Sequence, residues 1–222
     1  LSTIAVSNTN IDATTLATRI DSYDTINVGS TTDMTLPSGA TINVDAAEVV
    51  HMLADETAGR LTISDQVINV TGAITVDNAN LLTGTTTGKV TATINTSETV
   101  TELATLNADG GANDLTIVIR AEDETTCTAA QLNTINAATA IAVDLNNVTA
   151  LSASSLSDLN TLFTAIGSSE FSNATGLTTI AVSDTTIDAT TLATRIDSYD
   201  TINGSSTTNM TLPSGATINV DA

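Results

Sequence analysis

The stretch Ile11-Asp-Ala-Thr-Thr-Leu-Ala-Thr-Arg-Ile-Asp-Ser-Tyr-Asp-Thr-Ile-Asn27 occurs a second time, unchanged, as residues 187–203. The identity extends to both sides of it. Residues 177–222 repeat residues 1–46 at an offset of 176, and 40 of the 46 positions match because only positions 2, 8, 10, 28, 29 and 33 differ. Such agreement among Thr and Ser residues exceeds what a shared fold requires and indicates a recent duplication. We therefore expect a window on a longer array, in which residues 1–176 form one large repeat and residues 177–222 begin the next.

A shorter pattern recurs inside the large repeat. A small polar residue, which we expect to cap a helix, is followed four residues later by Leu or Val. Its side chain can accept a hydrogen bond from a free amide of the first helical turn. The steps between these residues sum to 176, so the large repeat is expected to hold six unequal modules, each with a short capped helix. The expected caps are Asp12, Asp45, Asp77, Thr99, Thr128, Ser152 and Asp188, and capping boxes are expected with Glu48, Glu102 and Gln131.

Strand-like alternation of apolar and polar residues comes before the caps. It is found at residues 3–6, 41–44, 73–76, 90–94, 115–119 and 140–143, with additional pieces at 25–28 and 66–70. Strand, turn and capped helix in fixed order predict an α/β fold, a repetitive solenoid with a parallel β-sheet. Because strands lie about 4.8 Å apart and packed helices about 8–10 Å apart, two strands per helix would keep the stack straight. We expect an elongated rod whose two copies lie roughly 50–60 Å apart.

The composition excludes several classes of partner. The chain has 25 acidic and 5 basic residues and a net charge of −20, which repels phosphate backbones, so no nucleic acid is expected to bind. The longest apolar runs are a few residues, so no membrane insertion is expected. The aromatic residues are few, whereas ligand pockets usually recruit them. Acidity with few lysines is typical of proteins that work outside the cell.

Candidate catalytic residues are scarce. His51 and Cys127 are each the single residue of their type, so one chain cannot assemble a Cys-His or Ser-His-Asp set. We expect His51 at the surface or core edge of a helix at residues 46–53, and Cys127 as a small buried residue. Paired carboxylates would allow a polysaccharide-active enzyme, but no aromatic-lined cleft accompanies them. We therefore predict no enzyme, and no catalytic or cofactor-binding residues.

Calcium is the metal best suited to this sequence, because it takes oxygen ligands alone. Carboxylates cluster in residues 109–114, 122–124 and 21–24, and the first of these resembles a calcium-binding nonapeptide turn that is one residue short. Such turns work as ladders over successive repeats, whereas this one occurs once. We expect solvated loops and helix ends at all three, and predict no metal ligands.

The spacing of apolar residues resembles a known repeat family. Leu177, Ile180, Val182 and Ile187 occupy positions 1, 4, 6 and 11 of a leucine-rich-repeat frame, and residues 138–148 fit the same frame with an Asn at the ninth place. Thr-, Ala-, Asn- and Asp-rich units in near-identical long copies are also similar to the repeat regions of giant bacterial surface proteins. The resemblance implies an elongated architecture outside the cell or on its surface.

These observations together favour a structural function. We expect a segment of a very large, acidic extracellular protein that acts as a filament, spacer or surface coat. Its partners would be neighbouring repeats of the same protein, with end-to-end self-association. The alternative is an adhesin-type module that binds a glycan or a cell surface and is rigidified by calcium.

Overall fold

The computed structural model describes residues 3–26, 33–108, 112–202 and 209–220. The chain divides into two compact units: unit 1 comprises residues 1–95 and 112–116, and unit 2 comprises residues 96–111 and 117–222. Both are built from short parallel strands and helices, so the predicted α/β class with parallel sheets is confirmed.

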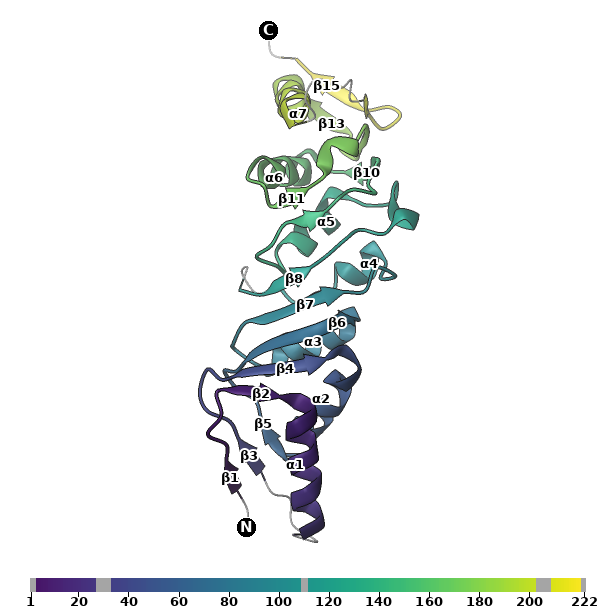
Figure 1. Ribbon diagram of the computed structural model, residues 1–222. Coiled ribbons are helices and arrows are strands. Elements are labelled where there is room, and N and C mark those ends of the chain that lie inside the picture. The colour runs from purple at the N-terminus through teal and green to yellow at the C-terminus, as the bar shows by residue number, and fades with distance from the viewer. Residues whose placement is uncertain (1–2, 27–32, 109–111, 203–208, 221–222) are drawn as a thin grey trace. The chain divides into compact units, whose positions relative to one another are not determined.

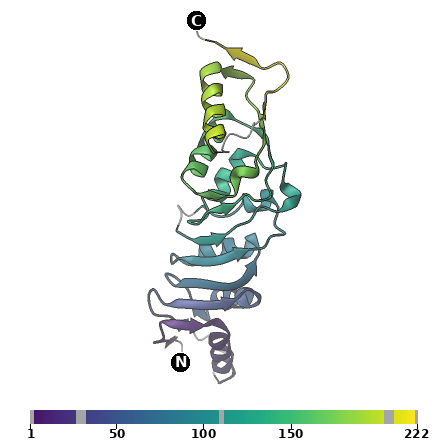
Figure 2. The same cartoon turned by 45° about the horizontal axis from the view of Figure 1, so that its top comes forward.

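Unit 1 contains two parallel sheets (Figures 1 and 2). The first has the strand order β1 (Thr3–Ala5), β3 (Asp33–Thr35), β5 (Leu61–Thr62). The second has the order β2 (Asn10–Asp12), β4 (Thr41–Asp45), β6 (Val67–Ile74), β7 (Val90–Ile94), β8 (Asp114–Thr116). The helices are α1 (Ala13–Ile26), the 3-10 turn η1 (Ala46–Glu48), α2 (Val49–Thr57) and α3 (Val76–Thr85). The first modules thus add one strand to each sheet and then a helix.

The apolar alternation explains the second sheet of unit 1. Ile11 is the register partner of Ile42, Ile42 of Ile68, and Ile68 of Val90, and all four are buried. Successive residues of a strand point to opposite faces of the sheet. Because these four residues are in register on adjacent strands, their branched side chains form one continuous row that faces the core. The β6 strand changes register between Asn69 and Ala73, where Gly72 has a φ of 93° that favours glycine.

Unit 2 contains smaller parallel sheets and a row of packed helices. Its helical segments are α4 (Val100–Leu103), η2 (Ala121–Asp123), α5 (Ala129–Asn136), α6 (Leu156–Gly167), η3 (Ala174–Gly176) and α7 (Ala189–Ile202). Its strands are β9 (Val143–Asp144), β10 (Ala150–Ser154), β11 (Phe171–Ser172), β12 (Thr179–Val182), β13 (Thr186–Asp188), β14 (Asn209–Thr211) and β15 (Thr217–Asn219). The sheets are β10-β12-β14, β9-β11 and β13-β15, and α6 packs between α5 and α7.

The two copies of the duplicated sequence fold alike. Thr3 pairs with Asp33 in the first copy, and Thr179 pairs with Asn209 in the second. Asn10 pairs with Thr41, and Thr186 pairs with Thr217. Each of these positions is displaced by 176 residues from its counterpart, and α1 and α7 span the same 14 positions. The local conformation therefore follows from the sequence of each copy.

The predicted caps are partly right. Asp12, Thr99, Thr128 and Asp188 accept from the third amide of their helices, and capping boxes form with Glu102 and Gln131. The other expected caps are wrong. Asp45 precedes the 3-10 turn η1 and Glu48 ends it, and neither side chain makes a cap bond. Thr75 rather than Asp77 caps α3, and Ser155 rather than Ser152 caps α6.

Several strand predictions also need correction. Residues 25–26 are the end of α1 rather than a strand, because the helix runs for 14 residues; residues 27–28 lie outside the described part. In the stretch 140–143 only Val143 is in a strand, and in the stretch 115–119 the strand ends at Thr116. Val76 begins α3 instead of ending β6. The strands at 41–44 and 90–94 agree with the structure to within about a residue, whereas the strand predicted at 66–70 begins at Val67 and continues to Ile74.

Candidate functional site

In unit 2, hydrogen bonds connect the start of a helix in one module to a side chain of the next module. We call these contacts the junctions. At each of three helices, the first backbone amide donates to a side chain of the module that follows. The bonds run from Val100 to Asp123 Oδ2 (2.7 Å), from Ala129 to Ser154 Oγ (2.9 Å) and from Leu156 to Asp184 Oδ2 (2.7 Å). The caps Thr99, Thr128 and Ser155 take the third amide of the same helices.

These junction bonds fix how one module sits on the next. The first amides of a helix have no partner inside the helix, and a buried amide without a partner costs about 1–3 kcal/mol. A shift of one residue between modules would move the acceptor away from the amide. The local cap and the side chain from the following segment together fix how each of these three helices lies against that segment.

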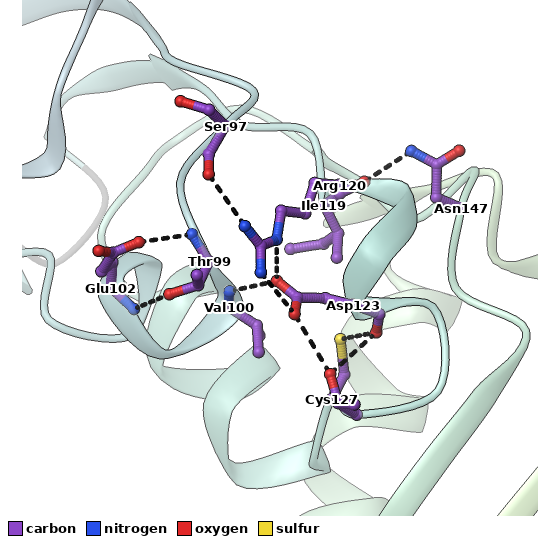
Figure 3. Close-up of polar contacts among 10 residues, drawn as sticks. Ser97, Thr99, Val100, Glu102, Ile119, Arg120, Asp123, Cys127 and Asn147 are labelled. Atoms are coloured by element: carbon purple, nitrogen blue, oxygen red, sulfur yellow. Dashed lines mark hydrogen bonds and ion pairs between the residues drawn. The ribbon is translucent and has the colours of Figure 1, made fainter.

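Asp123 is the centre of the junction drawn in Figure 3. It lies on η2 with an exposed fraction of 6%. Besides the bond from Val100, it accepts one from Arg120 Nε at 2.9 Å, and Arg120 Nη1 also donates to the carbonyl of Ser97 at 3.2 Å. Burial by itself raises the pKa of the Asp123 carboxyl, but the bonds from Arg120 and Val100 outweigh it, so the pKa lies below the ordinary value of 3.8.

Two further contacts complete this junction (Figure 3). Asn147 Nδ2 donates to the carbonyl of Ile119 at 2.7 Å and so connects the next module. Cys127 is fully buried and its thiol donates to the carbonyl of Asp123 at 3.2 Å. Burial and the charge of Asp123 raise the pKa of the Cys127 thiol to about 12. A thiol that stays protonated is a poor nucleophile, and the prediction of a buried Cys127 is confirmed.

Unit 1 is held together by different groups. Asn43 Nδ2 donates to Asn10 Oδ1 at 2.6 Å, and Asn69 Nδ2 lies 3.4 Å from Asn43 Oδ1. These asparagines come from β2, β4 and β6 and form a short ladder across three strands. Sequence reasoning missed this ladder because it sought Asn at the ninth place of a leucine-rich frame. The signal was present in Asn-Ile at β2 and in Ile-Asn-Val at both β4 and β6.

Ion pairs add to the module contacts of unit 1. Arg60 reaches Asp24 of α1 at 3.0 Å and also binds Asp55 of α2. Burial raises the pKa of Asp55, even though Arg60 lowers it in part. Lys89 Nζ lies 2.6 Å from Asp114 of β8. The exposed Lys89–Asp114 pair contributes about 0–1 kcal/mol, whereas Asp55 is 7% exposed and its pair with Arg60 is partly buried.

The structure places the other candidate residues apart from one another. His51 is exposed on α2, as predicted for a helix-surface residue. Of the proposed calcium turn, residues 109–111 lie outside the described part, while Asn113 accepts from the Val90 amide at 2.7 Å. Among the described residues, no group of three or more His, Cys, Asp or Glu side chains gathers in a way that could hold a metal ion.

The four apolar residues that suggested a leucine-rich frame at residues 177–187 all face inward. Leu177, Ile180, Val182 and Ile187 are all buried. In the second frame, Ala138, Val143 and Val148 are buried and Ile141 is half-buried. Asn146 at its ninth place is exposed, and the neighbouring Asn147 makes the contact to another module. The frame therefore identifies inward positions but not the polar ladder.

Comparison with protein-family models, with curated proteins and with solved structures returned no match. Within the described residues, no helix has the combined length and apolar character needed to cross a membrane. The geometry of the junctions is therefore the basis on which a function can be argued.

Proposed function

We propose that this chain is a non-enzymatic structural segment of a very large, acidic extracellular bacterial protein. In this account its α/β modules continue as a solenoid and build a filament, spacer or surface coat. The observation that carries the proposal is the equal strand register of the two copies, 176 residues apart. A fold that returns to the same local structure after a fixed period can be extended by adding periods.

The module junctions support this proposal. In a stack where each unit touches only its neighbours, stability is approximately a sum of unit and interface terms. The bonds of Val100, Ala129 and Leu156 to the following module supply such an interface at each of three helices. Further modules can be added without changing the existing contacts. The net charge of −20 would keep a long assembly soluble.

The ionisable groups favour a structural role over a catalytic one. Asp123 and Arg120 hold a helix amide and a backbone carbonyl, and Cys127 is buried. A catalytic acid, base or nucleophile must instead reach a substrate. These groups are used for holding modules together.

Small-angle X-ray scattering on the purified chain tests the proposal. A compact domain of this length has a radius of gyration of about 17 Å, and we expect a clearly larger value, roughly 20 Å or more, with a distance distribution skewed to long distances. A value near that of a compact domain would contradict a spacer or filament. Calorimetry with calcium and a glycan array test the adhesin alternative, for which the structural account expects no binding.

A further inference from the structure

The two copies of the duplicated sequence are buried by neighbouring elements on opposite faces. In the second copy, Ile180 and Tyr199 are 0% exposed and Val182 is also buried. Their counterparts in the first copy, Ile4, Val6 and Tyr23, are only half-buried. These side chains have the same sequence neighbours, so the difference comes from what lies against them.

The opposite relation holds for the other face. Ile20 is 1% exposed while Ile196 is 36% exposed, and Val44 is 2% exposed while Val220 is 76% exposed. In the first copy α2 packs against α1 and β4 pairs with β6. In each copy, therefore, neighbouring elements bury one face of the duplicated unit, and the other face is more exposed to solvent.

The residues that cover the second copy are known. Strand β10 pairs with β12, so β12 lies inside its sheet. The ring of Phe163 on α6 lies 5.1 Å from that of Tyr199, and the hydroxyl of Tyr199 donates to the Leu177 carbonyl. The amide of Leu156 donates to Asp184, which closes the contact at the start of α6.

The same face of the first copy is open. Strand β1 is one of the two edge strands of its sheet, whose order is β1-β3-β5. A hollow of about 540 Å³ lies beside it and is lined by apolar side chains together with polar ones, among them Asp12 and Arg19. We call this surface the open face; its lining includes Ile4, Val6, Ile11, Leu16 and Tyr23. An edge strand has unpaired backbone groups that can pair with another strand, and the hollow beside it can accommodate a helix.

We propose that the open face binds a second copy of residues 143–176, supplied by another 176-residue repeat of the same kind. The occupant would place a strand like β10 against β1 and a helix like α6 over Tyr23. This inference rests on the proposed function and names its partner. Its basis is that residues 143–176 already cover the matching face of the second copy in this chain.

One difference between the copies falls on a hydrogen bond of this contact. Asp184, which accepts from the Leu156 amide, is replaced by Asn8 in the first copy. The Oδ1 atom of Asn8 can also accept that bond. It lacks the negative charge that is favoured at the start of a helix. The docked state should therefore form with Asn8 and be tighter in the variant Asn8→Asp.

The test extends the full chain rather than shortening it. A second copy of residues 143–176 is joined directly before Leu1, which recreates the Gly176–Leu177 junction almost unchanged. Hydrogen exchange is then compared between the extended and the original chain. Peptides must include position 8 or 10, because residues 11–27 and 187–203 have the same mass. We expect amide protection across residues 10–20 to rise about tenfold or more, because local opening must then break the added contacts.

Matched variants separate docking from mere extension of the chain. Phe163→Ala in the added segment alone should reduce the new protection, whereas Asn8→Asp should increase it. Helix content by circular dichroism should rise as the added α6 sequence folds. If residues 10–20 exchange equally fast in the original chain, the extended chain and its Asn8→Asp variant, the proposal is overturned. That result would leave the solution shape, on which the proposed function is tested, unaffected.

Discussion

The backbone amide of Val100 donates to the carboxylate of Asp123 at 2.7 Å, although 23 residues separate them. Val100 is the first residue of α4, and Asp123 ends η2 in the next module. The same relationship joins Ala129 to Ser154 and Leu156 to Asp184. The capping of these three helices of unit 2 is therefore shared with the segment that follows each of them.

Removal of the Asp123 carboxylate should destabilise unit 2. In Asp123→Ala, the Val100 amide and the Arg120 guanidinium lose a buried partner, so we expect the free energy of unfolding to fall by about 1–3 kcal/mol. Chemical denaturation followed by circular dichroism measures this. Glu122→Ala is the matched control, since it removes the same charge from an exposed neighbour on η2 and should change stability by less than about 0.5 kcal/mol. Equal losses in both variants would show that the junction bond is unimportant.

The contribution of Asp123 should depend on pH. Its pKa in the folded state is lower than the ordinary 3.8, so the stabilisation is present above that value and is lost as pH falls through the folded pKa. The stability difference between the natural chain and Asp123→Asn should therefore be constant near neutral pH and shrink below about pH 3.8. Denaturation at a series of pH values checks this. A difference that grows with acidity would contradict the assigned direction of the pKa shift.

Cys127 should report on opening of unit 2. Its thiol is buried and its pKa is raised to about 12, so alkylation by iodoacetamide near pH 8 requires local unfolding. We expect the rate in the native protein to be at least about 100-fold lower than in denaturant. Mass spectrometry at timed intervals measures it. Comparable rates in the native and denatured protein would show that the α4–α5 region is open in solution.

The duplicated tyrosines offer a comparison within one chain. Tyr199 is fully buried against Phe163, whereas Tyr23 lines the open face. Tyr199→Ala should cost roughly 3–5 kcal/mol in the stability of the second copy, and Tyr23→Ala about 1 kcal/mol or less in that of the first. Hydrogen exchange of peptides that include position 8 or 184 resolves the two copies. Equal effects would mean that the two environments do not differ in solution.

Apolar alternation in the sequence predicted some strands well but missed others, such as β3 and β10. Apolar alternation located β4, β6 and β7 because a buried row requires it in every rung. Helix caps were harder to assign, since Ser and Thr are abundant and several candidates lie within a few residues. Ser152 lies inside β10, where its amide donates to the Cys127 carbonyl, and only Ser155 stands at the true start of α6.

The junction acceptors could not be predicted from the sequence. Asp123 and Ser154 look like ordinary loop and strand residues, and their partners lie 23 and 25 residues earlier. Because the modules have unequal lengths, no fixed spacing relates a helix amide to its acceptor in the next module. Only the three-dimensional register brings the two together. The same is true of the Phe163 and Tyr199 rings, which are 36 residues apart in the chain.

We expect the modules to continue in one direction, so that the two copies are separated by a full period. Spin labels at Thr14→Cys and Thr190→Cys would occupy equivalent exposed positions on α1 and α7, and the buried Cys127 should remain unlabelled. Pulsed electron–electron double resonance then measures the distance between the labels. Six modules that advance about 8–10 Å each predict a distribution centred at roughly 50–60 Å. A distance below about 30 Å, as expected for two copies packed together in one compact domain, would contradict the account.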